Sequence, residues 1–284
     1  MAIGINTPYA ALKALRTATA SANQASERIS TGLRINSASD DPAGLVRANN
    51  LAVEIGAYTQ VKTNIASALT QVERVNDSLT SMASILASMK TLALASSTET
   101  DSTVLADNAT AFDSYMADLK TIAESTTING TSVLDDDSAS YAIQVGTGSS
   151  TYDTKTLTFW DVTPDGGLTT SDGGSTNISS LDISTASGAS SAYDDLDYAI
   201  DTINSHLATV GAYETSLGYL SDFADAMITN TTADYDNVMS ADLAQEATNL
   251  AAAEILQNSS MAIVAQSNSL SKELVDMLLD SVTD

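Results

Sequence analysis

The sequence predicts a mainly α-helical protein in which long, coiled-coil-like helices from both ends of the chain flank a small β-hairpin and loop tip. Three observations predict this class. Apolar residues recur every seven positions over long stretches, 43% of residues are apolar while only 5% are aromatic, and strand-type sequence is confined to the middle of the chain. Much of the apolar share is alanine, which suits long helices with narrow seams better than a bulky globular core.

The clearest heptad pattern predicts a helix over residues 57–96. Two seam positions, three residues apart, run through it: Tyr58, Ile65, Val72, Leu79 and Leu86, and Val61, Ala68, Val75, Met82 and Met89. Consecutive repeats of this kind specify a supercoiled seam rather than an isolated surface helix. At the standard rise the helix is roughly 60 Å long, and its narrow apolar stripe needs partner helices.

The same kind of pattern predicts partner helices over residues 104–122 and 196–217. The two chain ends carry thinner stripes, flanked by Ser, Thr, Asn and Gln. These stripes consist of Ile5, Leu12, Ile29 and Leu33 near the start, and of Leu256, Ile263, Leu270, Leu274 and Met277 near the finish. Such helices are marginal alone, so we expect both ends to fray in a lone molecule.

Strand and turn signals lie between the helices. The dipeptide Asn129-Gly130 favours a hairpin turn. Apolar residues alternate as in two short strands, at Tyr141, Ile143, Val145, Leu157 and Phe159. Residues 161–190 are mostly Asp, Gly, Ser, Thr and small apolar residues, and this composition predicts an exposed loop rather than a core.

The charge distribution excludes two classes of partner. The chain carries 11 Lys and Arg against 36 Asp and Glu, a net charge of −25, so there is no cationic surplus for nucleic acid or for an anionic membrane surface. Residues 1–75 hold seven basic and five acidic residues (+2), and residues 76–284 hold four and thirty-one (−27). The slightly basic start and the acidic end of the chain could attract each other, within one molecule or between copies.

No catalytic, cofactor or metal site is predicted. The chain has no cysteine and one histidine, which excludes thiolate chemistry and two-histidine zinc motifs. We interpret His206 as a structural residue rather than a catalytic one. The acidic runs 135–137 and 194–197 lack the ligand spacing of an EF-hand, so solvated turns or helix starts are the preferred interpretation. We therefore expect no enzyme and no cofactor.

Two terminal motifs carry a family resemblance. Residues 27–44, ERISTGLRINSASDDPAG, closely resemble the N-terminal signature of bacterial flagellins. Residues 253–257, AEILQ, and 264–268, VAQSN, resemble the flagellin C-terminal helix. Residues 143–146, IQVG, are similar to the flagellin β-hairpin, and residues 5–7, INT, to its opening.

The resemblance implies five segments. These are an inner-tube helix and connector (residues 1–45), helices of an outer rod-like domain (46–128), a β-hairpin and Ser/Thr/Gly-rich exposed tip (129–190), a C-terminal rod-domain helix (191–239) and a C-terminal inner-tube helix (240–284). The terminal stripe residues named above would mediate polymerisation. The connector would include Arg34, Asp40, Asp41, Pro42 and Gly44, with Asp41 capping a helix that Pro42 begins and Gly44 allowing a sharp path.

The resemblance also implies a function: a structural subunit that self-assembles into the extracellular flagellar filament for motility. Its partners would be other copies, an export chaperone on the C-terminal segment, hook-associated and cap proteins, and the flagellar type III export apparatus. Export would need no cleaved signal peptide, and no such segment is visible near the start. A flagellin-like hook–filament junction protein is the alternative. A metalloprotease flagellin is disfavoured by the single histidine and the short insert.

Two surface features follow from the resemblance. Flagellins detected by the innate immune receptor carry Arg, Leu and Gln on an exposed helix patch, where this chain aligns Ser88, Leu92 and Ala95. Losing the Arg and Gln removes hydrogen bonds from that patch, so we expect weak or absent receptor activation. The Ser/Thr-rich tip is compatible with O-linked glycans and with a plain loop.

Overall fold

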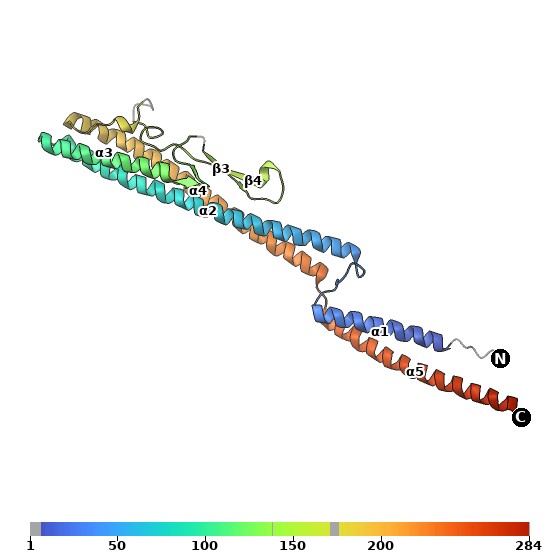
Figure 1. The fold of residues 1–284 in the computed structure, drawn as a ribbon. Helices are drawn as coiled ribbons and strands as arrows, with labels where there is room; N and C mark the ends of the chain where they lie inside the picture. Colours follow the sequence, from blue (N-terminus) through green and yellow to red (C-terminus); the bar gives the residue numbers. More distant parts are fainter. Residues whose placement is uncertain (1–6, 138, 171–175, 284) are drawn as a thin grey trace. The chain divides into compact units, whose positions relative to one another are not determined.

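The computed structural model describes residues 7–137, 139–170 and 176–283. Five helices dominate it (Figure 1): α1 (Thr7–Thr31), α2 (Pro42–Ser97), α3 (Ser102–Ser125), α4 (Ala186–Met239) and α5 (Leu243–Thr283). The chain forms two compact units. Unit 1 comprises Met1–Glu54 and Asn230–Asp284, and unit 2 is Ile55–Thr229.

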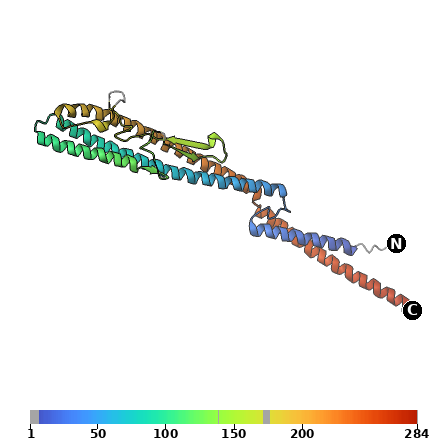
Figure 2. The ribbon, with the colours of Figure 1, turned by 45° about the horizontal axis from the view of Figure 1, so that its top comes forward.

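In unit 2, α2 and α4 run antiparallel. Lys62 Nζ lies 2.6 Å from Asp225 Oδ1, and Asn76 Nδ2 donates to Glu214 Oε1 over 2.9 Å. In these contacts the residue numbers rise along α2 as they fall along α4, so the two helices run in opposite directions. Two views of the ribbon also show this (Figures 1 and 2).

The predicted heptad seam is confirmed. Apart from Tyr58, which is half-buried, every predicted seam residue of the 57–96 helix is buried. The buried face of α4 keeps the same period, at Ala189, Leu196, Ile203, Val210, Leu217, Ala224, Thr231 and Val238. In unit 2 these two seams belong to one core cluster, so each helix supplies the cover that the other needs.

The predicted helix over 104–122 is α3, which runs antiparallel to α2. Asn108 Nδ2 donates to Ser96 Oγ, and Thr126 Oγ1 donates to Ser78 Oγ. The carboxylate of Asp101 accepts from the backbone N–H of Thr103, which caps the helix start. Phe112 and Leu119 face the core, at 1% and 0% exposure.

Both predicted hairpins are present. β1 (Thr127–Ile128) and β2 (Thr131–Ser132) pair antiparallel, and the turn between them has positive φ at Asn129 (53°) and Gly130 (84°), as a type I′ turn requires. β3 (Ser140–Gln144) and β4 (Thr154–Thr158) pair antiparallel, with the 3₁₀ turn η1 (Thr151–Asp153) before β4.

The prediction of an exposed loop over residues 161–190 is wrong for most of its described part. Val162, Leu168, Ile178 and Ile183 are almost completely buried and join the core of unit 2, with a 3₁₀ turn, η2 (Ile178–Ser180), among them. The polar residues satisfy the backbone locally, because the side chains of Asp161, Asp182 and Thr185 accept nearby backbone N–H groups. Residues 171–175 of the predicted loop lie outside the described residues.

One 18-residue window of α2 is apolar enough, by length and composition alone, to cross a membrane, although the sequence has no run of eighteen apolar residues. The heptad residues of this helix from Val61 to Met89 form the buried seam of unit 2, whereas Val53 and Leu94 are exposed. The core helix of a protein that never enters a bilayer has the same composition.

Candidate assembly surface of the terminal helices

The two terminal helices form an antiparallel pair within unit 1. Arg28 Nη1 lies 2.9 Å from Glu246 Oε1, and Gln257 Nε2 donates to Thr19 Oγ1 over 3.2 Å. The backbones of α1 and α5 are in contact with each other, as in a packed helix pair. The described parts of both ends are helical and pack against each other, and the expectation that they fray in a lone molecule stays a prediction.

Small residues make this close approach possible. The buried positions recur every seven residues on both helices, at Ala11, Ala18 and Ala25 on α1 and at Glu246, Ala253 and Ser260 on α5. An alanine seam brings backbones together but buries little apolar area per residue. The pair is therefore held by a thinner core than the α2–α4 seam.

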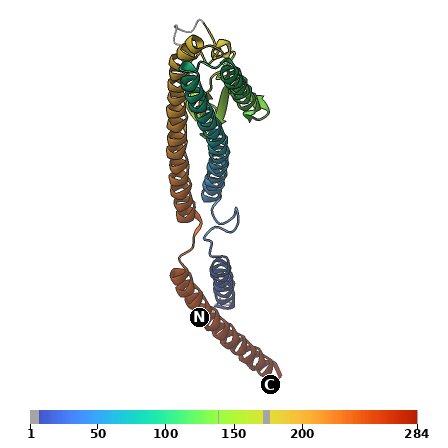
Figure 3. The same ribbon diagram turned by 90° about the vertical axis from the view of Figure 1, so that its left-hand side faces the viewer.

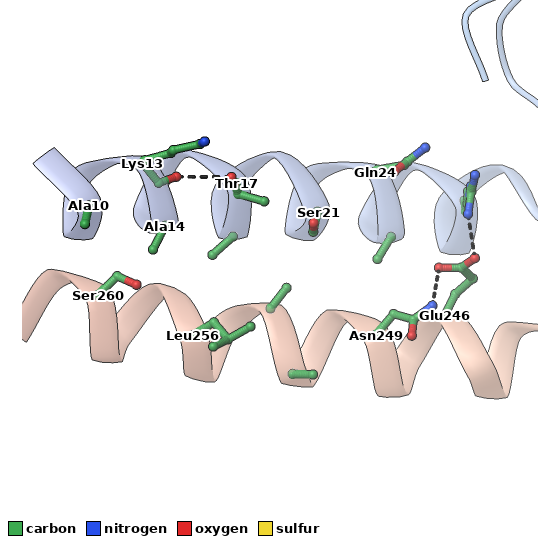
Figure 4. A pocket seen from close by; sticks show the side chains of 15 residues that line it. Ala10, Lys13, Ala14, Thr17, Ser21, Gln24, Glu246, Asn249, Leu256 and Ser260 are labelled. Atoms are coloured by element: carbon green, nitrogen blue, oxygen red, sulfur yellow. Dashed lines mark hydrogen bonds and ion pairs between the residues drawn. The ribbon is translucent and has the colours of Figure 1, made fainter.

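An open groove of about 710 Å³ runs between the two helices (Figure 4). Its floor is mostly alanine, including Ala14 and Ala18, and Leu256 and Ser260 line it from α5. Lys13 lines it from α1. Because short side chains leave this space unfilled, the groove can receive side chains from outside the pair.

One ion pair closes the end of the groove. Glu246 Oε2 accepts from Asn249 Nδ2, and Glu246 Oε1 accepts from Arg28 Nη1. These contacts, that of Asn249 foremost, lower the pKa of Glu246 below its ordinary value. The Nε of Arg28 is buried and has no hydrogen-bond partner within the described part of the chain.

Most of the predicted polymerisation residues are exposed in the α1–α5 pair, and Leu256 lines the groove between the two helices. Five of them are between 41% and 69% exposed: Leu12, Leu256, Ile263, Leu270 and Met277. Ile29 and Leu33 are half-buried, and Leu33 packs against the small core of unit 1 around Ile35. Ile5 and the side chain of Leu274 lie outside the described residues.

The predicted polymerisation residues omit three further exposed apolar residues of α5: Ile255, Met261 and Val275. They fall outside the heptad positions used for the prediction. A search for all apolar residues excluded from the alanine seam would have found them.

The connector residues lie beside the end of α4 in unit 1. The backbone N–H of Arg34 donates to the carbonyl of Met239, and Arg34 Nη2 donates to the carbonyl of Val238 over 2.7 Å. Asp40 accepts backbone N–H groups of Ser37 and Asn36, and these bonds lower the pKa of its carboxyl.

The capping geometry predicted at Asp41 and Pro42 is present, since Asp41 Oδ1 accepts from the Gly44 N–H over 2.8 Å and α2 begins at Pro42. Gly44, however, does not bend the chain: it lies in the first turn of α2. A Cβ there would meet the Asp41 carboxylate and lie 2.6 Å from Ile35 Cδ1, so glycine is needed for close approach. The sharp turn falls at Gly32, with φ of 71°.

Ser88, Leu92 and Ala95 line a second groove, in unit 2. It has a volume of about 360 Å³ and is completed by Thr91 of α2 and by Ala111 and Tyr115 of α3. No charged side chain is among its lining residues.

His206 is half-buried beside the tip segment. Its ring stacks on that of Trp160 at 4.2 Å between centroids, and burial lowers its pKa. Over residues 7–137, 139–170 and 176–283, no cluster of three or more acidic or histidine side chains could hold a metal ion.

Comparison with known proteins gives consistent matches at both ends of the chain. Residues 5–139 match the bacterial flagellin N-terminal helical region, and residues 193–278 match the bacterial flagellin C-terminal helical region.

Relatives match over nearly the whole length. A flagellin of Halalkalibacterium halodurans is 28% identical over 90% of this chain and 91% of its own. A flagellin of Listeria monocytogenes is 28% identical over 96% and 99%. Among solved structures, a protein assigned as flagellar hook-associated from Vibrio parahaemolyticus shares the fold, with a TM-score of 0.61 at 17% identity over 71% of this chain and 100% of its own.

Proposed function

Because the chain belongs to the bacterial flagellin family, and is therefore a structural subunit of the flagellar filament, we propose that α1 and α5 are the segments through which copies polymerise. One observation carries this proposal: the pair buries its alanine seam and leaves its large apolar side chains exposed. Monomers rarely keep a row of exposed Leu, Ile and Met on one helix without a partner for it.

Two further features support the proposal. The groove between the helices has room for side chains of a neighbouring copy. The unpartnered Nε of Arg28 is a buried donor, and leaving such a group unpaired costs about 1–3 kcal/mol. If assembly rearranges the Arg28 side chain so that an acceptor of a neighbour reaches this N–H, the cost is removed and the pair is stabilised.

The other segments receive roles by the same proposal. Residues 1–45 and 240–284 form the inner layer with its connector, residues 46–128 and 191–239 form the helices of the outer domain, and residues 129–190 form the solvent-facing tip. Arg34 and Asp41 hold the connector to the neighbouring backbone and to the start of α2.

The remaining partners are proposed from family membership. The chaperone would bind the C-terminal segment, because the exposed apolar residues of α5 would otherwise self-associate before export. Hook-associated and cap proteins would contact the filament ends, and the type III apparatus would export the chain without cleavage of a signal peptide.

We propose that the chain has no enzymatic activity, since its one histidine is stacked on Trp160. The junction protein remains the alternative, because a hook-associated protein shares the fold. Relatives matched along their whole length are flagellins, which favours the filament subunit. Counting copies per flagellum distinguishes the two, with thousands expected for a filament subunit.

The immune-receptor patch is also a proposal. Ser88 and Ala95 cannot make the charge-assisted or amide hydrogen bonds of Arg and Gln, so purified monomer should activate the receptor weakly. A full response in reporter cells would contradict this.

Deletion of residues 241–284 tests the polymerisation proposal. The truncated chain should keep the helices of unit 2, seen by circular dichroism, and should fail to extend filament seeds that the full chain extends. Growth of seeds from the truncated chain would refute the role of α5.

A further inference from the structure

Methionine carries the sulfur chemistry of this chain. The sequence has eight methionines and no cysteine, and peroxides oxidise the sulfur of either residue type. Oxidation of a methionine turns a flexible apolar side chain into a polar sulfoxide, which disrupts an apolar contact that the thioether would stabilise. The exposure of each methionine therefore decides where a peroxide acts.

The described methionines differ sharply in exposure. Met261 and Met277 of α5 are 46% and 69% exposed. Met82 and Met89 are completely buried in the α2–α4 seam, and Met239 is 6% exposed in the small core of unit 1. Two others, on α3 and α4, are half-buried. Because peroxides react first with sulfur atoms that solvent reaches, the two most reactive methionines both lie on α5.

Met277 lies on a part of α5 that the described part of α1 does not cover. Gln257 of α5 donates to Thr19 of α1, and the two helices are antiparallel, so the start of α1 at Thr7 lies opposite about residue 269. Met277 is about eight residues further along α5, roughly 12 Å by helix rise. In Figure 3, the ribbon of α5 continues past that of α1.

Both methionines belong to the apolar surface of α5 that the proposed function assigns to neighbouring copies. Met277 continues the exposed row of Ile263 and Leu270 at seven-residue spacing. Met261 follows Ser260, which is buried and lines the groove between α1 and α5. A polar group at either methionine therefore changes a surface that assembly is proposed to bury.

The reaction with hydrogen peroxide is a two-electron oxidation of the thioether. The sulfur lone pair attacks one peroxide oxygen, the O–O bond breaks and a sulfur–oxygen bond forms. The proton on the transferred oxygen leaves with the departing hydroxide, so the sulfide is oxidised to a sulfoxide and the peroxide is reduced to water. The sulfoxide oxygen accepts hydrogen bonds from water, and burying it without a donor costs free energy.

We propose that Met261 and Met277 are oxidation sites that control polymerisation. The proposal rests on assembly through α5. Peroxide converts both residues in the free subunit and prevents that subunit from joining a filament, whereas subunits already assembled have these side chains covered. The buried methionines of the two cores do not react, so the oxidised subunit keeps its fold. Oxidants therefore stop growth without dissolving existing filaments.

Peptide mapping by mass spectrometry tests the first step. Monomer and preformed filaments are exposed briefly to hydrogen peroxide. In the monomer, Met261 and Met277 should each gain one oxygen atom at least about tenfold faster than Met82 and Met89. In filaments, the two α5 residues should react at least about tenfold more slowly than in the monomer. Equal rates in monomer and filament would overturn the proposal.

Assembly of the oxidised monomer tests the second step. Its critical concentration should rise at least about tenfold, as loss of one buried apolar side chain does, with unchanged circular dichroism. Methionine sulfoxide reductases should restore the original value. Assembly of the doubly oxidised chain at the untreated critical concentration would overturn the proposal.

Two leucine variants identify the residues responsible, since a Met to Leu change conserves volume. Met261→Leu with Met277→Leu should assemble like the parent and keep doing so after peroxide treatment. The matched control, Met82→Leu with Met89→Leu, keeps both exposed methionines and should lose assembly on oxidation as the parent does. Equal inhibition of the first variant and the parent by peroxide would refute the assignment.

A polar substitution tests the same sites without any oxidant. Met261→Gln with Met277→Gln should assemble as poorly as the oxidised chain, and assembly at the parental critical concentration would count against the proposal. Failure of the untreated parent to form filaments would instead contradict the assembly function itself. Filaments that form equally well from untreated and doubly oxidised subunits would leave that function standing and remove the control by oxidation.

Discussion

Exposed apolar residues of α5 should contribute to assembly and not to the stability of the monomer. We take the double variant Leu256→Gln with Ile263→Gln, because the two side chains are 59% and 54% exposed and Gln preserves helix propensity. Full burial of a Leu or Ile side chain is worth about 1.5–3 kcal/mol. Scaled by the exposed fractions, the two residues have roughly 1.7–3.4 kcal/mol left to gain from a neighbouring copy.

At about 1.4 kcal/mol for each factor of ten, the double variant should raise the critical concentration for polymerisation roughly 15- to 250-fold. The assay is sedimentation of filaments grown from seeds at a series of monomer concentrations. Asn258→Gln is the matched control, since it places the same new residue at an exposed polar position of the same helix. Assembly of the double variant at the parental critical concentration, with unchanged helicity, would refute the argument.

Three further predictions concern the two units. Leu79 is completely buried, so Leu79→Ala should lower the free energy of unfolding of unit 2, measured by urea denaturation, by about 2.7–5 kcal/mol. A loss under about 1 kcal/mol would contradict the burial of Leu79 in the seam. The pKa of Glu246 is lowered, first by the hydrogen bond from the Asn249 amide. The stability that this carboxylate adds to the folded state is therefore complete above the unfolded pKa of about 4.5 and is lost as the pH falls through the lower folded pKa. Glu246→Gln should speed hydrogen exchange in α1 at pH 7 and match the parent in strong acid. Burial lowers the pKa of His206, so the folded state loses stability as the pH falls below about 6.5. The fluorescence of the stacked Trp160 should titrate below that value, and His206→Phe should abolish this transition.

The α2–α4 packing was predictable because its seam residues contrast strongly with their neighbours. Val72 and Leu79 stand among Ser, Thr, Gln and Asp, so the seven-residue period identifies the buried face directly. The I′ turn at Asn129-Gly130 was predictable for a local reason, since these two residues tolerate positive φ.

The α1–α5 packing was not predictable in the same way, although both helices also follow heptads. Alanine at positions 11, 18 and 25 contrasts weakly with the surrounding Ser and Thr, so hydropathy does not mark it as a seam. The Leu and Ile residues of α5 follow a stronger heptad pattern, but they lie mostly on the face that α1 does not cover. The prediction of an exposed loop over residues 161–190 failed for another reason. The average composition of this segment is polar, and it conceals a few apolar residues whose side chains are buried.

The division of charge between the two units explains why terminal helices suit polymerisation. Unit 2 holds 5 basic and 23 acidic residues, a net of −18, while unit 1 holds 6 and 13, a net of −7, and these sum to the total of −25. Lysines of unit 2 pair with acidic residues of the same unit, as Lys62 does with Asp225 and Lys120 with Asp165, and the net of −18 already includes them. We therefore expect apolar burial between copies to meet less electrostatic opposition in unit 1, where the exposed Leu, Ile and Met residues of α5 lie.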